Sequence, residues 1–401
     1  MRTDFDGALV RLARSFHAFS LEEVASQVDK TRQFLFKIET NQASPTDELI
    51  EQIARVLMVE PTFFKSDVLR PAITEDEVHF RRLVAAKAST RNAVLARAEL
   101  FLRLVGVLET KVRFPTVSVP SALDVTDAES VERAAESCRQ AFNVGTGPIS
   151  NMVRLVENAG VVVTTFGATS TEVDALSTSR QRPIIVRNRA KTSVCRQRFD
   201  IGHELGHLIM HQGRTTGDRQ TESEAHRFAG ALLVPRGMMA KFFPRTKNGR
   251  LDWRALSEFK LHWKISKAAA LYRAQQLGLI DESRFRTGMI TLKRTGEAIV
   301  ETEDHLVQQE TPELIERSLE LLRLKRGVFA RDIASLLRVH VEFLENLLGR
   351  GDGGYDALPA RASATVLPFG EAPRRQVAEP EQAPEIVVLA DRPTVVLRRV
   401  K

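Results

Sequence analysis

Apolar residues recur at helical spacing through the first 64 residues, in short segments that polar turns separate. Two turns carry helix-start signals. Ser20 followed by Glu23 matches a capping box, and Thr31 precedes the next apolar run. The pattern predicts an all-α domain over residues 1–68 in which a tight turn joins the second and third helices. The expected helices are 4–16, 20–28, 31–38, 47–59 and 61–64.

A longer helical pattern follows at residues 81–108. We expect this helix to form most of a connector over residues 69–118, and to end before the prolines at 115 and 120. Between residues 119 and 290, helical segments and β-branched runs predict an α+β domain with a small sheet. We expect strands at 161–166 and 183–186, a loop at the Ser- and Thr-rich segment 168–179, and helices at 128–143, 151–159 and 196–211.

A third region, residues 291–350, is helical at 312–324 and 328–348. The latter segment contains two short helices around Arg338-Val339-His340, which fit either a second helix-turn-helix or a helical cap or dimer element. Residues 351–401 contain six of the sixteen prolines, so we expect a flexible tail that ends in a short apolar strand at 394–400. We recognise no internal repeat.

The composition narrows the class of protein. A chain of 401 residues with 43% hydrophobic residues supports two or more domains with real cores. Its two cysteines, Cys138 and Cys195, provide no disulfide framework and favour a reducing compartment. We find neither a signal-peptide pattern nor an apolar run of membrane-spanning length. We therefore expect a cytoplasmic protein with no membrane partner.

The sequence His203-Glu204-Leu205-Gly206-His207 matches the His-Glu-x-x-His zinc-protease pattern. On a helix, the two imidazoles lie one turn apart on one face and can converge on one metal ion. A carboxylate from a second helix would complete a His2Glu set with an open position for water. Glu222 and Glu224 are the candidates, and only one of them can face the metal because they are two positions apart. The alternative is a core helix with satisfied histidines.

Helix geometry excludes two other residues as ligands. His211 and Cys195 each lie eight residues from one end of the motif, about 12 Å along a helix, whereas zinc ligands lie about 2 Å from the ion. We expect His211 to end the helix. In the chemistry that the motif predicts, Glu204 is the catalytic base that takes the proton of the attacking water. We identify no oxyanion donor, and we expect Tyr272 to pack in the core.

Residues 196–211 and 222–235 together resemble the ImmA/IrrE metallopeptidase family, and further motifs extend the resemblance over most of residues 120–290. The resemblance implies a zincin-like (gluzincin) core of bacterial or phage origin that cleaves DNA-binding repressors. It also implies Glu222 as the third ligand and one Zn²⁺ per chain, with another divalent metal such as Mn²⁺ as the alternative. His226 stands where the family has Asn, so it could orient Glu222 or compete as a ligand, and Glu224 is the other alternative ligand or supporting group.

Residues 8–64 resemble the XRE-type, or lambda-repressor-like, helix-turn-helix domain, whose recognition segment aligns with residues 31–37. By this alignment Arg32 would contact guanine, Gln33 adenine and Lys37 phosphate in double-stranded DNA. Phe36 is the fourth candidate for DNA contact, although a phenylalanine at this position, as at Phe34, is unusual on a surface that reads DNA. Either phenylalanine would complete the core or, if exposed, contact a protein. The alternatives to DNA binding are therefore protein recognition or dimerisation, and a vestigial scaffold.

The net charge of +7 is unevenly distributed. Residues 1–80 contain nine Lys and Arg residues and fourteen Asp and Glu residues, a net charge of −5, which opposes phosphate binding. Residues 81–113 contain eight Lys and Arg residues against Glu99 and Glu109. We expect a solvated basic face on the connector helix, and the alternative is additional phosphate contact beside the helix-turn-helix.

Two classes of function remain. In the first, a zinc endopeptidase cleaves a protein substrate, a helix-turn-helix repressor, to switch transcription, and its own N-terminal domain binds DNA. In the second, a DNA-binding regulator uses its zincin-like domain as a sensor or partner-binding module. The intact Glu204 favours the first, because a sensor needs the ligands but no base. A homodimer is an additional expected assembly.

Overall fold

The fold is described from a computed structural model of the 401-residue chain. The described residues are 5–65, 78–80, 88–122, 124–166, 175–178, 182–188, 192–214, 216–247, 249–350 and 387–388.

The N-terminal helices begin at side chains that cap their first backbone N–H groups, as the sequence predicts. Ser20 and Glu23 form the expected capping box, and Thr31 accepts from the backbone N–H of Phe34. The fourth helix ends three residues earlier than predicted, because Met58 takes a left-handed backbone conformation with φ of 53°. The elements are α1 (Gly7–Phe16), α2 (Leu21–Gln27), α3 (Arg32–Glu39), α4 (Asp47–Val56) and the 3₁₀ helix η1 (Pro61–Phe64).

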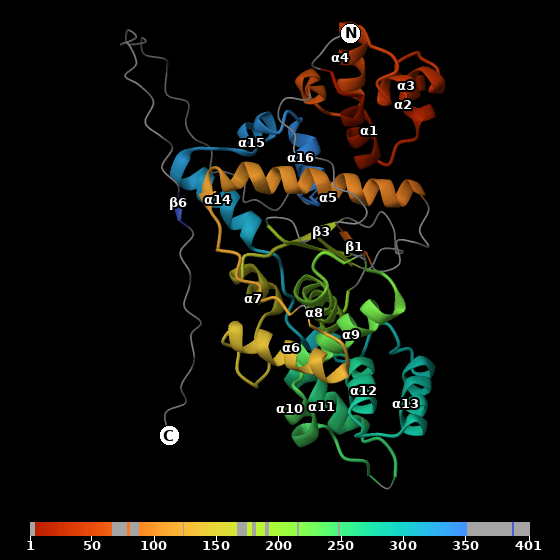
Figure 1. Cartoon of the computed structure of the whole chain (residues 1–401), viewed down its shortest axis with the longest axis vertical. Helices are drawn as coiled ribbons and strands as arrows, with labels where there is room; N and C mark the ends of the chain where they lie inside the picture. The colour runs from red at the N-terminus through yellow and green to blue at the C-terminus, as the bar shows by residue number, and fades with distance from the viewer. Residues whose placement is uncertain are drawn as a thin grey trace, which may run out of the picture.

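The expected connector is a long helix, α5 (Ala88–Glu109), with a buried face, and residues 81–87 of that prediction lie outside the described residues. In Figure 1, α5 crosses the molecule between the helix-turn-helix and the sheet. The guanidinium of Arg97 lies 4.7 Å from the Phe16 ring centroid, and Arg103 pairs with Glu99. These two basic side chains therefore contact the protein itself, so they do not contribute to a solvated basic face.

Three C-terminal helices share one hydrophobic core with α5 and the helix-turn-helix. They are α14 (Leu314–Arg326), α15 (Ala330–Leu336) and α16 (Val341–Leu347). The strand expected at 394–400 lies outside the described residues. Nearby, β6 (Val387–Val388) pairs in parallel with β2 (Val112–Arg113).

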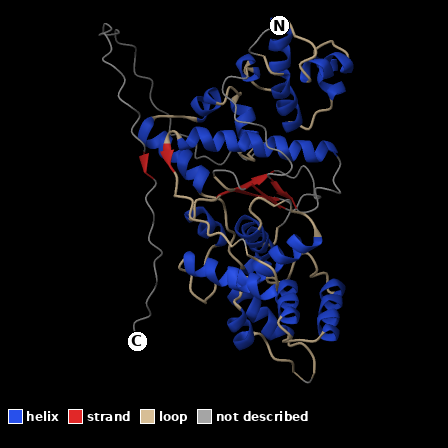
Figure 2. Cartoon of the chain, in the orientation of Figure 1, coloured by secondary structure: helices blue, strands red, loops and turns tan. Residues whose placement is uncertain are grey.

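A four-stranded sheet lies below α5 (Figure 2), with the order β1-β4-β5-β3. β3 (Val162–Phe166) and β5 (Ile184–Asn188) match the two predicted strands and pair in parallel, whereas the other neighbours are antiparallel. The expected loop is wrong at β4 (Ala175–Thr178), because that segment pairs with strands on both sides and backbone pairing tolerates Ser and Thr. Its remaining residues, 168–174 and 179, lie outside the described part of the chain, and β1 (Val78–Phe80) was not predicted.

The alternation of side chains along the sheet separates two cores. Val162, Ile184 and Val186 pack with α5 and the C-terminal helices, whereas Val163 and Ile185 pack with the helices on the opposite face. These helices are α6 (Ala128–Ala141), α7 (Met152–Asn158), α8 (Val194–Met210), α9 (Arg219–Leu233), α10 (Arg236–Phe242), α11 (Trp253–Trp263), α12 (Lys267–Gln276) and α13 (Glu282–Arg294), with the 3₁₀ helix η5 (Asp304–Leu306) after them.

Both cysteines are buried free thiols. Among the described residues, no helix is both long enough and apolar enough to cross a membrane.

Candidate functional site

Helix α8 contains the His-Glu-x-x-His motif. It lies in the core on the side of the sheet that Val163 and Ile185 face. His203, Glu204 and His207 are each only 1% exposed. One turn before them, the Arg198 guanidinium pairs with Glu310 and donates to the backbone oxygens of Ile149 and Lys264. This buried arginine therefore fixes α8 to three other segments of the chain, and the motif lies on a rigid helix.

Small residues on α8 allow α9 to pack very closely against it. A Cβ atom at Gly206 would lie 3.0 Å from the Phe228 ring, and one at Gly202 would lie 3.4 Å from Ala229. Larger residues at these positions would push α9 away. The glycine inside the motif thus contributes to the site, because close packing brings the acidic N-terminal turn of α9 toward the histidines.

Three predicted ligands converge in the structure. The Nε2 atoms of His203 and His207 lie 3.1 Å apart, and the Glu222 carboxylate oxygens lie 3.3 and 3.4 Å from them. One potential ligand atom from each of the three residues lies within 4.8 Å of the others. Two imidazoles and a carboxylate are the ligand set of many catalytic zinc sites. This donor chemistry fits the metal that the motif predicts, with Mn²⁺ as the alternative.

The environment of Glu222 favours its ionised form, which a metal ligand requires. Burial alone would raise the pKa of its carboxyl, but hydrogen bonds with His203 and His207 hold that pKa well below its ordinary value. The Glu222 side chain keeps 22% of its surface exposed, whereas the two histidines keep 1%. The cluster is therefore open to solvent on the α9 side.

Glu224 lies outside this cluster and contacts His211 instead. His211 caps the C-terminus of α8 as predicted, and its Nε2 lies 2.9 Å from Glu224 Oε2. The other ring nitrogen of His211, Nδ1, lies 2.8 Å from Nδ1 of His207. Burial lowers the pKa of His211, which favours a neutral ring. His211 lies outside the group of three converging ligands, and the sequence did not reveal its contact with His207.

Hydrogen bonds connect His207 through His211 to Glu224. The metal-facing nitrogen of His207 and the carboxylate of Glu224 together determine where the protons lie along them. If Nε2 of His207 offers its lone pair to a metal, Nδ1 of His207 has the proton and donates to His211. His211 then has its proton on Nε2 and donates to the Glu224 carboxylate. The three residues form a polarised chain that would fix both the tautomer and the ring orientation of His207.

His226 lies beside His203, and Tyr272 lies beside His226. The His226 ring centroid is 5.8 Å from that of His203 and 5.6 Å from that of Tyr272. The expectation that Tyr272 packs in the core is wrong. Its side chain is 37% exposed and its ring contacts His226 on α9. The spacing of apolar residues along α12 could not reveal this position, since it depends on how α12 packs against α9.

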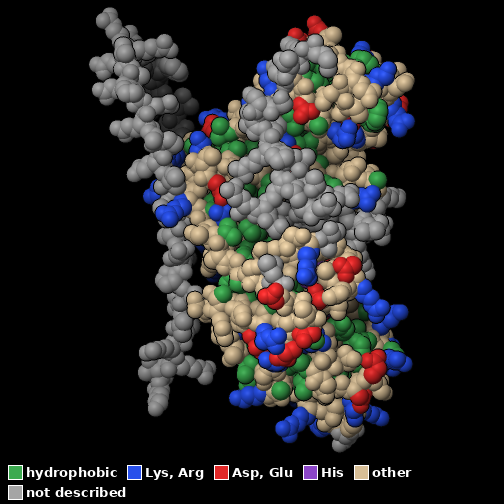
Figure 3. Space-filling view, viewed as in Figure 1, with side chains coloured by type: hydrophobic (Ala, Val, Ile, Leu, Met, Phe, Trp, Pro, Cys, Tyr) green, Lys and Arg blue, Asp and Glu red, His purple; other side chains and the backbone are tan. Residues whose placement is uncertain are grey.

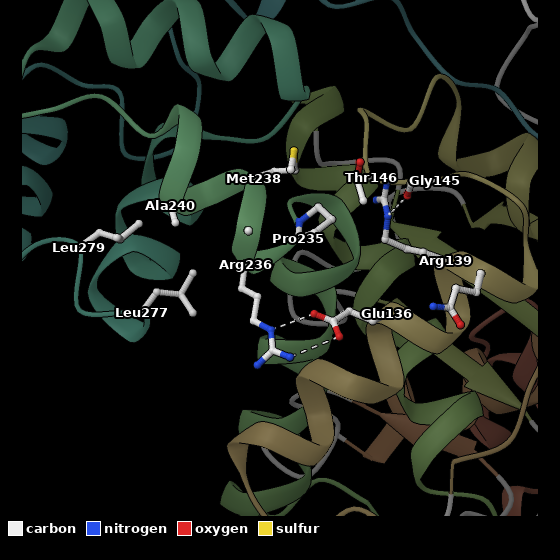
Figure 4. Close-up of a pocket in the computed structure, with 12 residues that line it drawn as sticks. Glu136, Arg139, Gly145, Thr146, Pro235, Arg236, Met238, Ala240, Leu277 and Leu279 are labelled. Carbon is white, nitrogen blue, oxygen red and sulfur yellow. Dashed lines mark hydrogen bonds and ion pairs between the residues drawn. The ribbon is translucent and has the colours of Figure 1, made fainter.

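A cavity of 740 Å³ lies apart from the motif and is lined by residues of α6, α10 and the segment after α12 (Figure 4). Its charged groups pair with one another or with the backbone. Arg236 bonds to Glu136, and Arg139 donates to the Gly145 carbonyl oxygen. None of the three converging ligands lines this cavity, so the chemistry of the chain does not centre there.

The predicted DNA-contacting residues lie on the outer face of α3. Arg32, Gln33 and Lys37 are exposed, as is Phe36 at 48%, whereas Phe34 packs partly against the core. The inner side of α3 is held by Glu39, whose carboxylate accepts from Arg14 at 2.6 and 2.9 Å. On the face shown in Figure 3, acidic and basic side chains are mixed rather than gathered into one basic surface.

Comparison with known protein families identifies two domains in this chain. Residues 156–275 match the IrrE N-terminal-like domain of the peptidase M78 family, and residues 17–64 match a helix-turn-helix family. No curated protein is similar enough to match the chain. The chain therefore combines an IrrE-like, metallopeptidase-type domain with an N-terminal helix-turn-helix domain, and both predicted resemblances are confirmed.

Proposed function

We propose that this protein is a zinc-dependent endopeptidase with a zincin-like (gluzincin) core, and that it cleaves a repressor-like DNA-binding protein to switch transcription. One observation carries the proposal: the two imidazoles of α8 and the Glu222 carboxylate of α9 converge around a single point, with Glu204 beside them on α8. His203, His207 and Glu222 would hold the ion, and Glu204 would be the base.

The residues of the site divide the chemistry among them. A bound zinc ion supplies Lewis acidity at the substrate carbonyl. Glu204 takes a proton from the attacking water and later gives it to the leaving amine, so that the acid and base steps use one carboxylate. The hydrogen bonds from His207 through His211 to Glu224 keep His207 in the tautomer that a metal ligand needs.

A peptide bond under attack also needs a donor for the developing oxyanion. His226 lies next to His203 and Tyr272 lies next to His226, and both have N–H or O–H groups that can donate. They are the candidates that the structure adds for this role. Neither was assigned to it from the sequence.

The helix-turn-helix domain supports the transcriptional part of the proposal. Its exposed Arg32, Gln33 and Lys37 are accessible to double-stranded DNA, which would bring the peptidase to a promoter where a repressor is bound. Exposed Phe36 keeps protein recognition as the alternative role of this surface.

The test compares cells that express the wild-type chain with cells that express Glu204→Gln at equal level. Mass spectrometry of new protein N-termini should reveal a DNA-binding protein that is cut only by the wild type. Equal sets of cut proteins, from variants that both retain metal and fold, would favour the alternative in which the domain is a sensor within a DNA-binding regulator.

A further inference from the structure

Two segments 280 positions apart share one sequence pattern. In residues 53–64 and 333–344, five of twelve positions are identical, and all five are apolar. The identical pairs are Ile53 and Ile333, Ala54 and Ala334, Leu57 and Leu337, Val59 and Val339, and Phe63 and Phe343. We expected no internal repeat, and that expectation was wrong here because the repeat is short.

The backbone repeats as well as the sequence. A helix ends in each segment, the next residue but one is left-handed (φ of 53° at Met58 and 59° at Arg338), and a second helix begins three residues after it. The backbone N–H of Val59 donates to Ala54 at 3.0 Å, and that of Val339 donates to Ala334 at 2.9 Å. The turn from α15 to α16 is therefore a second copy of the turn from α4 to η1.

The two copies pair with each other through a local twofold arrangement. Val59 and Val339 form an antiparallel bridge. The N–H of Glu60 donates to the Arg338 carbonyl oxygen at 2.8 Å, and the N–H of His340 donates to the Met58 carbonyl oxygen at 3.0 Å. Each copy thus gives and receives the same bond at equivalent positions, which is the property of a self-complementary interface.

Side chains close this contact from both sides. The Phe343 ring stacks on Phe16 with centroids 4.1 Å apart, and the Arg338 guanidinium donates to the Thr62 carbonyl oxygen at 2.8 Å. Val59 and Val339 are both buried. The helix α16 does not favour phosphate contact, since it contains Glu342 and Glu345 but neither Lys nor Arg. It pairs with protein instead.

We propose that the edge at residues 58–60 is a self-association surface of the helix-turn-helix unit, and that the C-terminal copy at residues 338–340 occupies it within each chain. The partner that fits this edge when the C-terminal copy is displaced is a second copy of this chain. A twofold pairing of two such edges would repeat both backbone bonds and the Val59 contact. The proposal is independent of the metal centre.

The first test is disulfide trapping in the full-length chain. Val59 and Val339 form a bridged pair without direct hydrogen bonds to each other, and such pairs are close enough for a disulfide. Under oxidised glutathione, V59C/V339C should form an intrachain link. The wild-type chain, whose two cysteines are buried, is the control and should form none. Absence of the link in V59C/V339C would overturn the pairing itself.

The second test displaces the C-terminal copy. Phe343→Ala removes the stacking on Phe16, so V59C/F343A should form interchain disulfides about fivefold more than V59C alone, the effect of an aromatic contact worth about 1 kcal/mol. The matched control is V59C/F343A/E60P. Glu60 has φ of −75°, which proline accepts, so this change removes the donor N–H from the edge without strain. It should return the yield to that of V59C.

Equal yields of interchain disulfide with and without Glu60→Pro would overturn the proposal. If Phe343→Ala unfolds the chain by circular dichroism, His340→Pro replaces it, because His340 also has φ of −75° and donates across the bridge. V59C/H340P should then form more interchain disulfide than V59C/E60P. Each variant loses one backbone hydrogen bond between the two copies, but only V59C/E60P loses a donor from the edge at residues 58–60. Equal yields for this pair would also overturn the proposal.

Discussion

The candidate metal centre, formed by His203, His207 and Glu222, and the helix α3 arrange their polar residues in opposite ways. In this candidate metal centre, His203 and His207 on α8 are buried, and they contact each other and Glu222 on α9. On α3, the residues predicted to contact DNA are exposed, and the chain fixes only the inner face of the helix, through Glu39 and Arg14. One site is organised before any ligand arrives, whereas the other presents side chains to a partner.

The two sites therefore differ in the energetic cost of their polar groups. Burying a histidine or carboxylate is costly unless it is paired, so a buried cluster of such groups with ligand geometry needs a reason beyond folding. Exposed Arg, Gln and Lys residues cost nothing, and many surfaces have them. The buried cluster of His203, His207 and Glu222 is therefore specific by its geometry, whereas the residues of α3 are distinguished by accessibility alone.

Replacement of Glu204 by Gln tests the organised site and should have the largest effect. The amide is nearly the same size and cannot accept a proton, so peptidase turnover should fall by about 10²–10⁴-fold while metal content and thermal midpoint stay close to wild type. Turnover on a substrate identified in cells, together with metal analysis, checks this. Activity within a few-fold of wild type would assign the base to another group.

The second prediction separates the two acidic residues of α9. Glu222→Ala should lose most bound zinc, because it removes a ligand from the cluster. Glu224→Ala should weaken zinc affinity by about 10–100-fold, because it removes a partner of His211 rather than a ligand. Metal content after dialysis against a chelator measures both. Greater loss in Glu224→Ala than in Glu222→Ala would reverse the two roles.

Local signals in the sequence account for what was predicted. The capping residues Ser20 and Thr31 lie next to the backbone groups that they satisfy, and the i, i+4 spacing of His203 and His207 sets their geometry within one helix. In both cases the residues that interact are close in sequence, so spacing alone gave the correct answer.

The features that the sequence did not reveal all depend on contacts between distant segments. The strand at 175–178 exists because β1 and β5 lie on either side of it, and Tyr272 is exposed because α12 packs beside α9. The pairing of Val59 with Val339 also requires two turns far apart in the chain. No periodicity within one segment contains this information.

The third prediction concerns the chain of hydrogen bonds behind His207. His211→Ala should weaken zinc affinity by about 10–100-fold, because the Nδ1 proton of His207 loses its acceptor. His211→Asn is the matched variant, since its amide oxygen can accept from His207 and its amide nitrogen can donate toward Glu224. It should recover part of the affinity in chelator competition. Equal affinity in wild type and His211→Ala would show that the contact does not orient the ligand.

The last prediction tests the exposed site. If α3 reads DNA, Arg32→Ala and Gln33→Ala should each reduce discrimination between a selected duplex and random DNA by about 1–3 kcal/mol, the value of a bidentate base contact. Lys37→Ala should weaken binding to both duplexes equally and flatten the salt dependence, since a phosphate contact has no sequence preference.

Phe36→Ala is the variant that distinguishes DNA from protein recognition on this face, because its exposed ring forms no hydrogen bond to a base edge. Competition binding at two salt concentrations measures all four variants. If no duplex from a random pool is selected by the wild-type chain, and only Phe36→Ala alters association with a protein substrate, the face of α3 is a docking surface for protein. The net charge of −5 over residues 1–80 makes this experiment decisive, since that charge opposes the phosphate contribution on which most DNA-binding domains depend.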